Sequence, residues 1–275
     1  MDPDEVVAAL WVECDRWSDL AASFQQLADA GFTEGSRAQL DTAAAAVIDP
    51  PPVVSHYVQE RAWNTARMLR GLHRWVFDTE PGKLHLDATV MYPLMRAALE
   101  DTTTIMWLQE PSSRDERLTR GLRAIHQDAL YFSKNHLLLA ATALGHGALT
   151  AELGGKLDTH VRQEREDFRA HFADLAGRLR LDPRDVTAQL ATSAPITAAY
   201  GDKSVERVTW GMLSDLSHFS YMMLRHLSTS PVPGSAVQLL HVTVLQFAQT
   251  LNRVSEDAIE ALRRAAERSD DAEVV

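Results

Sequence analysis

The chain has 275 residues, 45% of them hydrophobic, and a formal net charge of −11 at pH 7. This length and apolar content can supply a substantial hydrophobic core, which argues against a disordered chain. The acidic balance would repel phosphate backbones and so argues against nucleic-acid binding over a broad surface, although it leaves room for a local basic patch.

The first thirty residues predict a long helix. Asp2 can cap it, Pro3 fits its first position, and Gly31 ends it. Acidic residues recur through this segment, which is wrong for a signal peptide, and the longest apolar run, 137–144, is too short to cross a bilayer. Because Cys14 is the single cysteine, an intrachain disulfide and a cysteine-based zinc site are excluded. We therefore expect a soluble cytoplasmic protein that does not enter a membrane.

The rest of the chain shows helical spacing of apolar residues, interrupted by proline and glycine. After the first helix, the expected helices cover residues 36–48, 53–77, 91–109, 114–149, 157–179, 182–191, 204–227 and 235–268, with a loop at 192–203. No segment alternates apolar and polar residues over any length, so we expect no strand. The sequence predicts an all-α bundle of about eight or nine mostly antiparallel helices in a single domain, residues 1–268, followed by a disordered acidic tail, residues 269–275.

The helix that starts near Tyr92 is the most apolar one and carries an unusual polar stripe. At 100° per residue, Arg96, Glu100, Thr103 and Trp107 fall on one narrow face. A helix this apolar is expected to be buried, so its charges need partners from elsewhere in the chain.

A second stripe of similar character lies on the 204–227 helix and consists of Trp210, Ser214, Ser217, His218, Tyr221 and Arg225. We expect the two stripes to face each other across a polar cleft. The candidate ligand-binding residues are then Arg96, Glu100, Thr103, Trp107, Ser214, His218 and Tyr221. The alternative is a purely structural polar network that fixes the register of the helices.

A row of basic residues recurs at every third position of the 114–149 helix: Arg114, Arg117, Arg120, Arg123 and His126. Such a row drifts around a helix that has 3.6 residues per turn. It favours a solvated face with ion pairs to acidic neighbours. The alternative is a basic lip for an anionic ligand.

Motifs of enzymes and metal sites are weak in this sequence. Di-metal bundles need Glu-x-x-His pairs, whereas this chain has one related pair, Asp215 and His218. There is no Gly-x-Ser-x-Gly, phosphate-binding glycine loop or dinucleotide fingerprint. We expect no cofactor and no metal.

Small helical ribonucleases of the HEPN type use an arginine followed four to six residues later by a histidine. Three pairs fit that spacing, Arg67 with His73, Arg120 with His126, and Arg165 with His171, but chance accounts for that number. If the protein is an enzyme, the acid or base groups would be Glu100, His126 and His218.

Four segments carry a resemblance to a group of actinobacterial all-helical proteins: residues 96–100 (RAALE), 107–111 (WLQEP), 116–120 (ERLTR) and 214–218 (SDLSH). The corresponding segments of that group look like R-A-L-L-E, W-x-x-x-P, E-R-x-x-R and S-x-x-x-H. This chain differs in having Ser217 before the histidine and Trp210 where a tyrosine is common. The resemblance covers under a fifth of the chain and implies that the two stripes belong together, but it implies no activity. A looser likeness to HEPN-type and abortive-infection proteins is an analogy of fold.

The sequence therefore favours a binding or interaction protein with a polar cleft between the 91–109 and 204–227 helices, whose partner is a small molecule or a protein. One alternative is a metal-independent ribonuclease or small hydrolase. The other is a structural network in a protein that forms a homodimer through its apolar helices.

Overall fold

The computed structural model describes the chain except for residues 1, 46–53, 80–81, 146–149, 219 and 268–275. The described residues form eleven α-helices and no strand, so the all-α prediction is confirmed and the predicted number of helices is too low. The helices are α1 Pro3–Ala30, α2 Arg37–Ala45, α3 Val54–Asp78, α4 Ala88–Gln109, α5 Arg114–Gly145, α6 Ala151–Arg178, α7 Pro183–Thr187, α8 Ala194–Tyr200, α9 Val205–Ser217, α10 Tyr221–Thr229 and α11 Leu239–Ala266.

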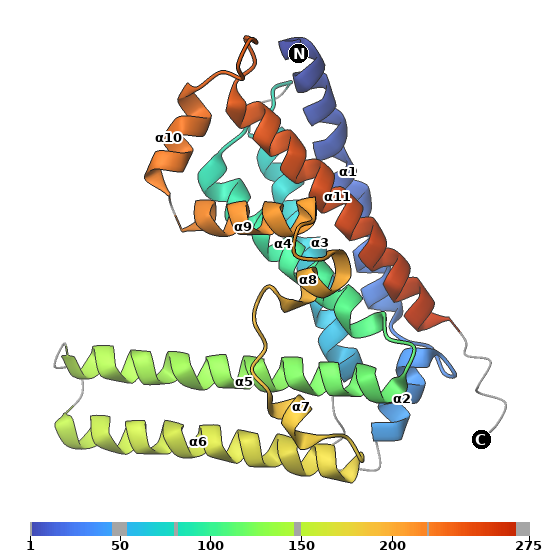
Figure 1. Cartoon of the computed structure of the whole chain (residues 1–275), viewed down its shortest axis with the longest axis vertical. Helices are drawn as coiled ribbons and strands as arrows, with labels where there is room; N and C mark the ends of the chain where they lie inside the picture. The colour runs from blue at the N-terminus through green and yellow to red at the C-terminus, as the bar shows by residue number, and fades with distance from the viewer. Residues whose placement is uncertain (1, 46–53, 80–81, 146–149, 219, 268–275) are drawn as a thin grey trace. The chain divides into compact units, whose positions relative to one another are not determined.

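The contacts divide the chain into two compact units, which are described separately. The first unit comprises the described residues within 1–39, 58–110 and 192–275. In it, α11 packs against α1 and α4, and α4 also packs against α8 and α9 (Figure 1). The core includes Tyr92 of α4, whose ring meets that of Phe247 of α11 edge-on at 5.6 Å between centroids. The expected burial of the helix around Tyr92 is thus confirmed.

The second unit comprises the described residues within 40–57 and 111–191. Its long helices α5 and α6 lie side by side, and the short α7 packs against both (Figure 1). Leu118 and Leu122 of α5 form a buried apolar cluster with Phe172 and Leu175 of α6. The expectations of a single domain and of a mostly antiparallel arrangement stay predictions.

Helix ends follow the capping signals of the sequence where these are strong. The carboxylate of Asp2 accepts from the Asp4 N–H at 3.0 Å, and Gly31 ends α1 at a φ of 64°. Ser204 caps α9 by accepting from the Arg207 N–H at 3.1 Å, as its sequence predicts. Asp87 caps α4 in the same way, so this helix begins before Met91 rather than at it.

Several predicted boundaries are wrong. The expected loop at 192–203 contains α8, because Pro195 occupies the first turn of that helix, where proline is tolerated. The expected helix at 204–227 is two helices, since the backbone leaves the helical conformation at His218 (φ −89°, ψ 17°). The helix predicted from residue 157 begins at Ala151, after the cap residue Thr150. The predicted tail at 269–275 lies outside the described residues.

None of the helices in the part of the chain that the structure describes is both long and apolar enough to cross a membrane.

Candidate functional site

The carboxylate of Glu100 is the centre of a polar cluster in the first unit. Its Oε1 accepts from Nε of Arg96, one turn earlier on α4, and from Nε1 of Trp210 on α9, each at 3.0 Å. Nη1 of Arg96 lies 3.3 Å from Nε2 of His218, in the turn after α9. The two helices thus contribute to one hydrogen-bonded group, which we call the Glu100 cluster: Arg96, Glu100, Trp210 and His218.

Two guanidinium groups flank the indole of Trp210. The Arg207 guanidinium lies 4.7 Å from the ring centroid, and that of Arg96 lies 5.8 Å from it. Both distances are within the range of cation–π attraction. Glu100 and the two arginines therefore fix both the edge and the face of the indole.

The Glu100 cluster is accessible to solvent. The side chains of Arg96 and Glu100 keep 22% and 27% of their exposure, and His218 is exposed. The sequence led us to expect a pair sunk in an apolar interior, whereas the structure leaves both side chains partly exposed. A ligand can therefore reach these groups without opening the fold.

The structure brings together only some of the candidate ligand-binding residues. Thr103 is buried, and its hydroxyl donates to the Leu99 carbonyl of its own helix at 2.7 Å. Trp107 is buried as well. Ser214 offers its backbone carbonyl to the His218 N–H at 3.3 Å. Tyr221 starts α10, and its side chain lies outside the described part of the structure. The role of every candidate as a ligand contact stays a prediction.

Glu100 also lines a cavity of about 370 Å³ between α3 and α4. Its walls are Arg61, Asn64, Arg67 and Met68 of α3 and Ala97, Glu100 and Asp101 of α4. Arg61 pairs with Asp101 at 2.5 Å, and Arg67 stacks over the ring of Trp63 at 5.5 Å. Our reasoning from sequence placed the cleft on the α9 side of α4 and missed this wall. The available signal was the spacing of Arg61, Asn64 and Arg67, three residues apart, which puts them at neighbouring positions on the polar side of an amphipathic helix.

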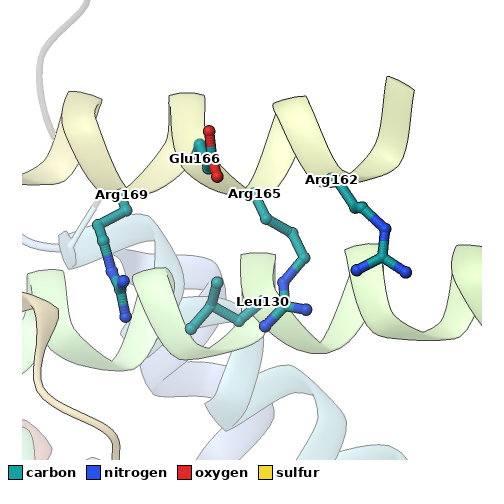
Figure 2. A pocket seen from close by; sticks show the side chains of 5 residues that line it. All are labelled: Leu130, Arg162, Arg165, Glu166 and Arg169. Carbon is teal, nitrogen blue, oxygen red and sulfur yellow. The ribbon is translucent and has the colours of Figure 1, made fainter. Parts of the chain in front are cut away.

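His126, a candidate acid or base, belongs to the second unit and is fully buried. Within the described structure neither ring nitrogen has a hydrogen-bond partner, and the ring meets Phe172 of α6 edge-on at 5.3 Å. Burial and the charge of Arg169, which extends from α6 toward α5 (Figure 2), lower the pKa of His126. Arg120, the arginine of its HEPN-type pair, binds Glu116 instead. The ring is closed off from solvent in this structure, and its assignment as a catalytic candidate stays a prediction.

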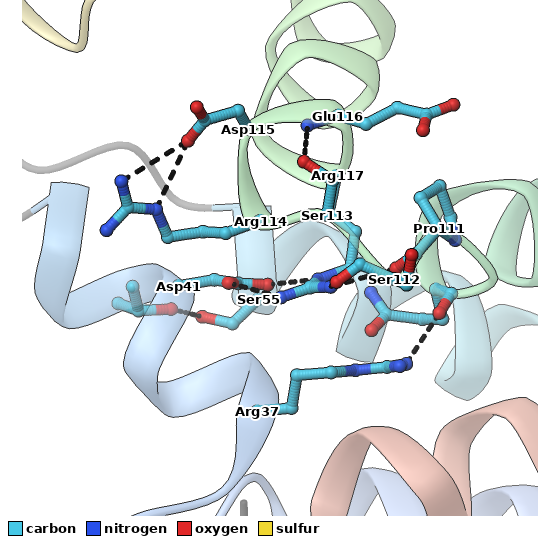
Figure 3. Close-up of polar contacts among 12 residues, drawn as sticks. Arg37, Asp41, Ser55, Pro111, Ser112, Ser113, Arg114, Asp115, Glu116 and Arg117 are labelled. Carbon is cyan, nitrogen blue, oxygen red and sulfur yellow. Dashed lines mark hydrogen bonds and ion pairs between the residues drawn. The ribbon is translucent and has the colours of Figure 1, made fainter. Parts of the chain in front are cut away.

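The basic row on α5 is not a uniform surface feature. Arg117 is buried and donates to both carboxylate oxygens of Asp41, at 2.6 and 2.8 Å, and to the carbonyls of Pro111 and Ser112 (Figure 3). Arg123 donates to the carbonyls of Ala188 and Gln189. The expectation of a solvated face fails at Arg117, and this residue is equally unavailable as part of a lip for an anion.

The described residues bring no three or more His, Cys, Asp or Glu side chains into an arrangement that could hold a metal ion.

No protein-family model matches the chain, and neither a curated protein nor a solved structure matches it. The proposals that follow therefore depend on the geometry alone.

Proposed function

We propose that this protein binds a small polar molecule at the Glu100 cluster and in the adjoining cavity between α3 and α4. The observation that carries the proposal is the double role of Glu100, whose carboxylate holds Arg96 and Trp210 while it lines the cavity. Ligand pockets combine concave walls with a few convergent polar groups, and this place has both.

The chemistry of the walls limits what the ligand can be. The polar groups of the wall are partly engaged: Arg61 pairs with Asp101, and Arg67 donates to Oδ1 of Asn64 at 3.4 Å. The wall still offers an incoming molecule the guanidinium of Arg67 and the carboxylate of Glu100. A carboxylate next to a guanidinium favours a ligand that carries hydrogen-bond donors at one end and acceptors at the other. A volume of about 370 Å³ suits a molecule at the small end of the range for drug-sized ligands.

The test is a mass-spectrometric search for a small molecule released when the purified protein is denatured. We expect the wild type to release one molecule in stoichiometric amount and Arg96→Ala and Glu100→Gln to release little of it. Arg264→Ala is the matched control, because it removes the arginine of another i,i+4 pair, with Glu260, on α11 of the same unit.

Thermal melting separates a binding role from a structural one. Because the cluster is partly exposed, we expect Arg96→Ala to change the melting temperature by only about 2 °C, consistent with the small worth of exposed ion pairs. A large loss of thermal stability, together with no released molecule in the wild type, would instead make the cluster a structural network.

The enzyme and homodimer alternatives have tests of their own. A ribonuclease or small hydrolase would draw on Glu100 and His218, each of which contacts Arg96. RNA cleavage that is lost in His218→Ala would favour that alternative over binding. Sedimentation would detect a homodimer.

Membership of the actinobacterial helical group and a cytoplasmic location also stand as proposals, and they rest on the sequence alone.

A further inference from the structure

The second unit contains a positively charged cavity that the proposed function does not use. It has a volume of about 250 Å³ and lies between α5 and α6, lined by Leu130 of α5 and by Arg162, Arg165, Glu166 and Arg169 of α6. Figure 2 shows the three arginine side chains extending from α6 toward α5, on either side of Leu130. Because the lining contains three arginines and one glutamate, the cavity is positively charged, although the chain as a whole has a net charge of −11.

Two of the three arginines have no acidic partner. Arg162 is held by Asp158, one turn earlier, at 2.7 Å. Arg165 and Arg169 form no ion pair and no side-chain hydrogen bond with any residue that the structure describes, Glu166 included. Elsewhere in this unit, Arg117, Arg120 and Arg123 each bind a carboxylate or a backbone carbonyl. Arg165 and Arg169 are also exposed to solvent, so both are available to a ligand in the cavity.

A buried histidine near Arg169 adds a second observation. His126 lies one turn before Leu130 on the same face of α5, fully buried and without a hydrogen-bond partner for either ring nitrogen. Burial and the charge of Arg169 lower the pKa of this imidazole. The charge of Arg169 thus acts on the His126 ring, so this ring can report on an anion that binds Arg169.

We propose that Arg165 and Arg169 bind a phosphate group of a small organic phosphate in this cavity. The two residues are four apart on one helix, so their Cβ atoms lie about 6 Å apart and their forks can converge on a single anion. A phosphate has three terminal oxygens and can accept from both forks at once, whereas one carboxylate is satisfied by one fork. Leu130 supplies an apolar contact for the organic part of the ligand.

Inorganic pyrophosphate, titrated calorimetrically into the full-length protein at low ionic strength, is the first probe. We expect one saturable site, which binds pyrophosphate more tightly than citrate. Arg165→Gln and Arg169→Gln should each weaken the binding at least about tenfold, since a charge-assisted hydrogen bond is worth more than a neutral one. Arg178→Gln is the matched control: it removes the same charge from the same helix, where Arg178 pairs with Asp174 outside the cavity.

The His126 ring provides a readout inside the protein. Bound pyrophosphate should shift the His126 ring resonances in an NMR spectrum of the wild type and leave them in place in Arg169→Gln. Absence of saturable binding, an equal loss in Arg178→Gln, or unmoved His126 resonances at saturation would overturn the proposal. So would tighter binding of a single-stranded RNA with a steep salt dependence, which would make the arginines part of a nucleic-acid surface.

Discussion

Arg117 of α5 and Asp41 of α2 form a two-fold hydrogen-bonded ion pair, Nε to Oδ2 at 2.6 Å and Nη2 to Oδ1 at 2.8 Å, between positions 76 residues apart. The side chains keep only 6% and 11% of their exposure. Nη1 of Arg117 also donates to the Pro111 and Ser112 carbonyls, so the guanidinium makes four hydrogen bonds (Figure 3). This pair fastens the segment that enters α5 to α2 within the second unit.

Removing one member of this pair should be costly. Arg117→Ala would leave the Asp41 carboxylate buried without its cation, and we expect the free energy of unfolding to fall by about 3 kcal/mol or more. Urea denaturation followed by circular dichroism measures the change. Arg114→Ala serves as the control, because its pair with Asp115 is more than half exposed and should contribute under about 0.5 kcal/mol. Equal losses in the two variants would contradict the buried arrangement.

The contrast between Arg117 and Arg96 shows what helical periodicity can predict. The angle between residues on one helix depends only on their spacing, so Arg96 and Glu100 could be placed together from the sequence. Their meeting with His218 followed from the wider expectation that charges on an apolar helix need partners. The same spacing argument placed Arg117 in a row of surface residues, because nothing in the sequence predicts that Arg117 contacts Asp41.

Other differences have local physical causes. No proline or glycine stands between Met212 and Tyr221, where α9 ends, so the break at His218 had no signal, and the predicted stripe is interrupted there. The wall of the cavity on α3 was missed because polar residues are ordinary on the outer side of an amphipathic helix, so nothing in the sequence distinguishes Arg61, Asn64 and Arg67. Contacts between distant segments, unlike helix periodicity, depend on the packing of the whole unit.

The buried His126 should make stability depend on pH. Its pKa is lowered in the folded protein from the ordinary value of 6.5. As the pH falls below about 6.5, the unfolded chain therefore takes up a proton before the folded one does, and the free energy of unfolding decreases, by up to about 1.4 kcal/mol per pH unit. His126→Phe should abolish this component in urea titrations between pH 7 and pH 5.

An exposed histidine on the facing helix gives the matched control for that experiment. His171→Gln changes a side chain that is open to solvent, so we expect it to keep the wild-type dependence on pH. His126→Phe should also raise stability near pH 7 by about 1 kcal/mol, because it removes two buried nitrogens without partners. If His126→Phe keeps the wild-type dependence of the free energy of unfolding on pH, other groups cause that dependence.

Cys14 should be inert in the folded protein. The thiol is buried on α1, and burial, together with the charge of Glu13, raises its pKa to about 12. Only the thiolate reacts with disulfide reagents, so at pH 8 we expect labelling of the native protein to proceed no faster than unfolding and to be complete within seconds in urea. Rapid stoichiometric labelling without denaturant would be inconsistent with this packing of α1.

Gly121 of α5 should not tolerate even one added carbon. A Cβ at this position would overlap both methyl groups of Val54, in the first turn of α3 and within the same unit. In an open helix position, replacing glycine by alanine raises the free energy of unfolding by about 1 kcal/mol. Here the overlap should outweigh that gain, so we expect Gly121→Ala to lower the free energy of unfolding by about 1–3 kcal/mol. Urea denaturation measures the effect.

The overlap can be separated from other effects by a double substitution. Val54→Ala removes both methyl groups, so Gly121→Ala should cost little or be favourable in that background, and the coupling between the two changes should be about 2 kcal/mol. Gly155→Ala on α6 is the matched control: a Cβ there meets nothing within 4 Å, and we expect a gain of about 0.5–1 kcal/mol. If Gly121→Ala stabilises the protein as Gly155→Ala does, α5 and the start of α3 do not approach as closely as the structure has them.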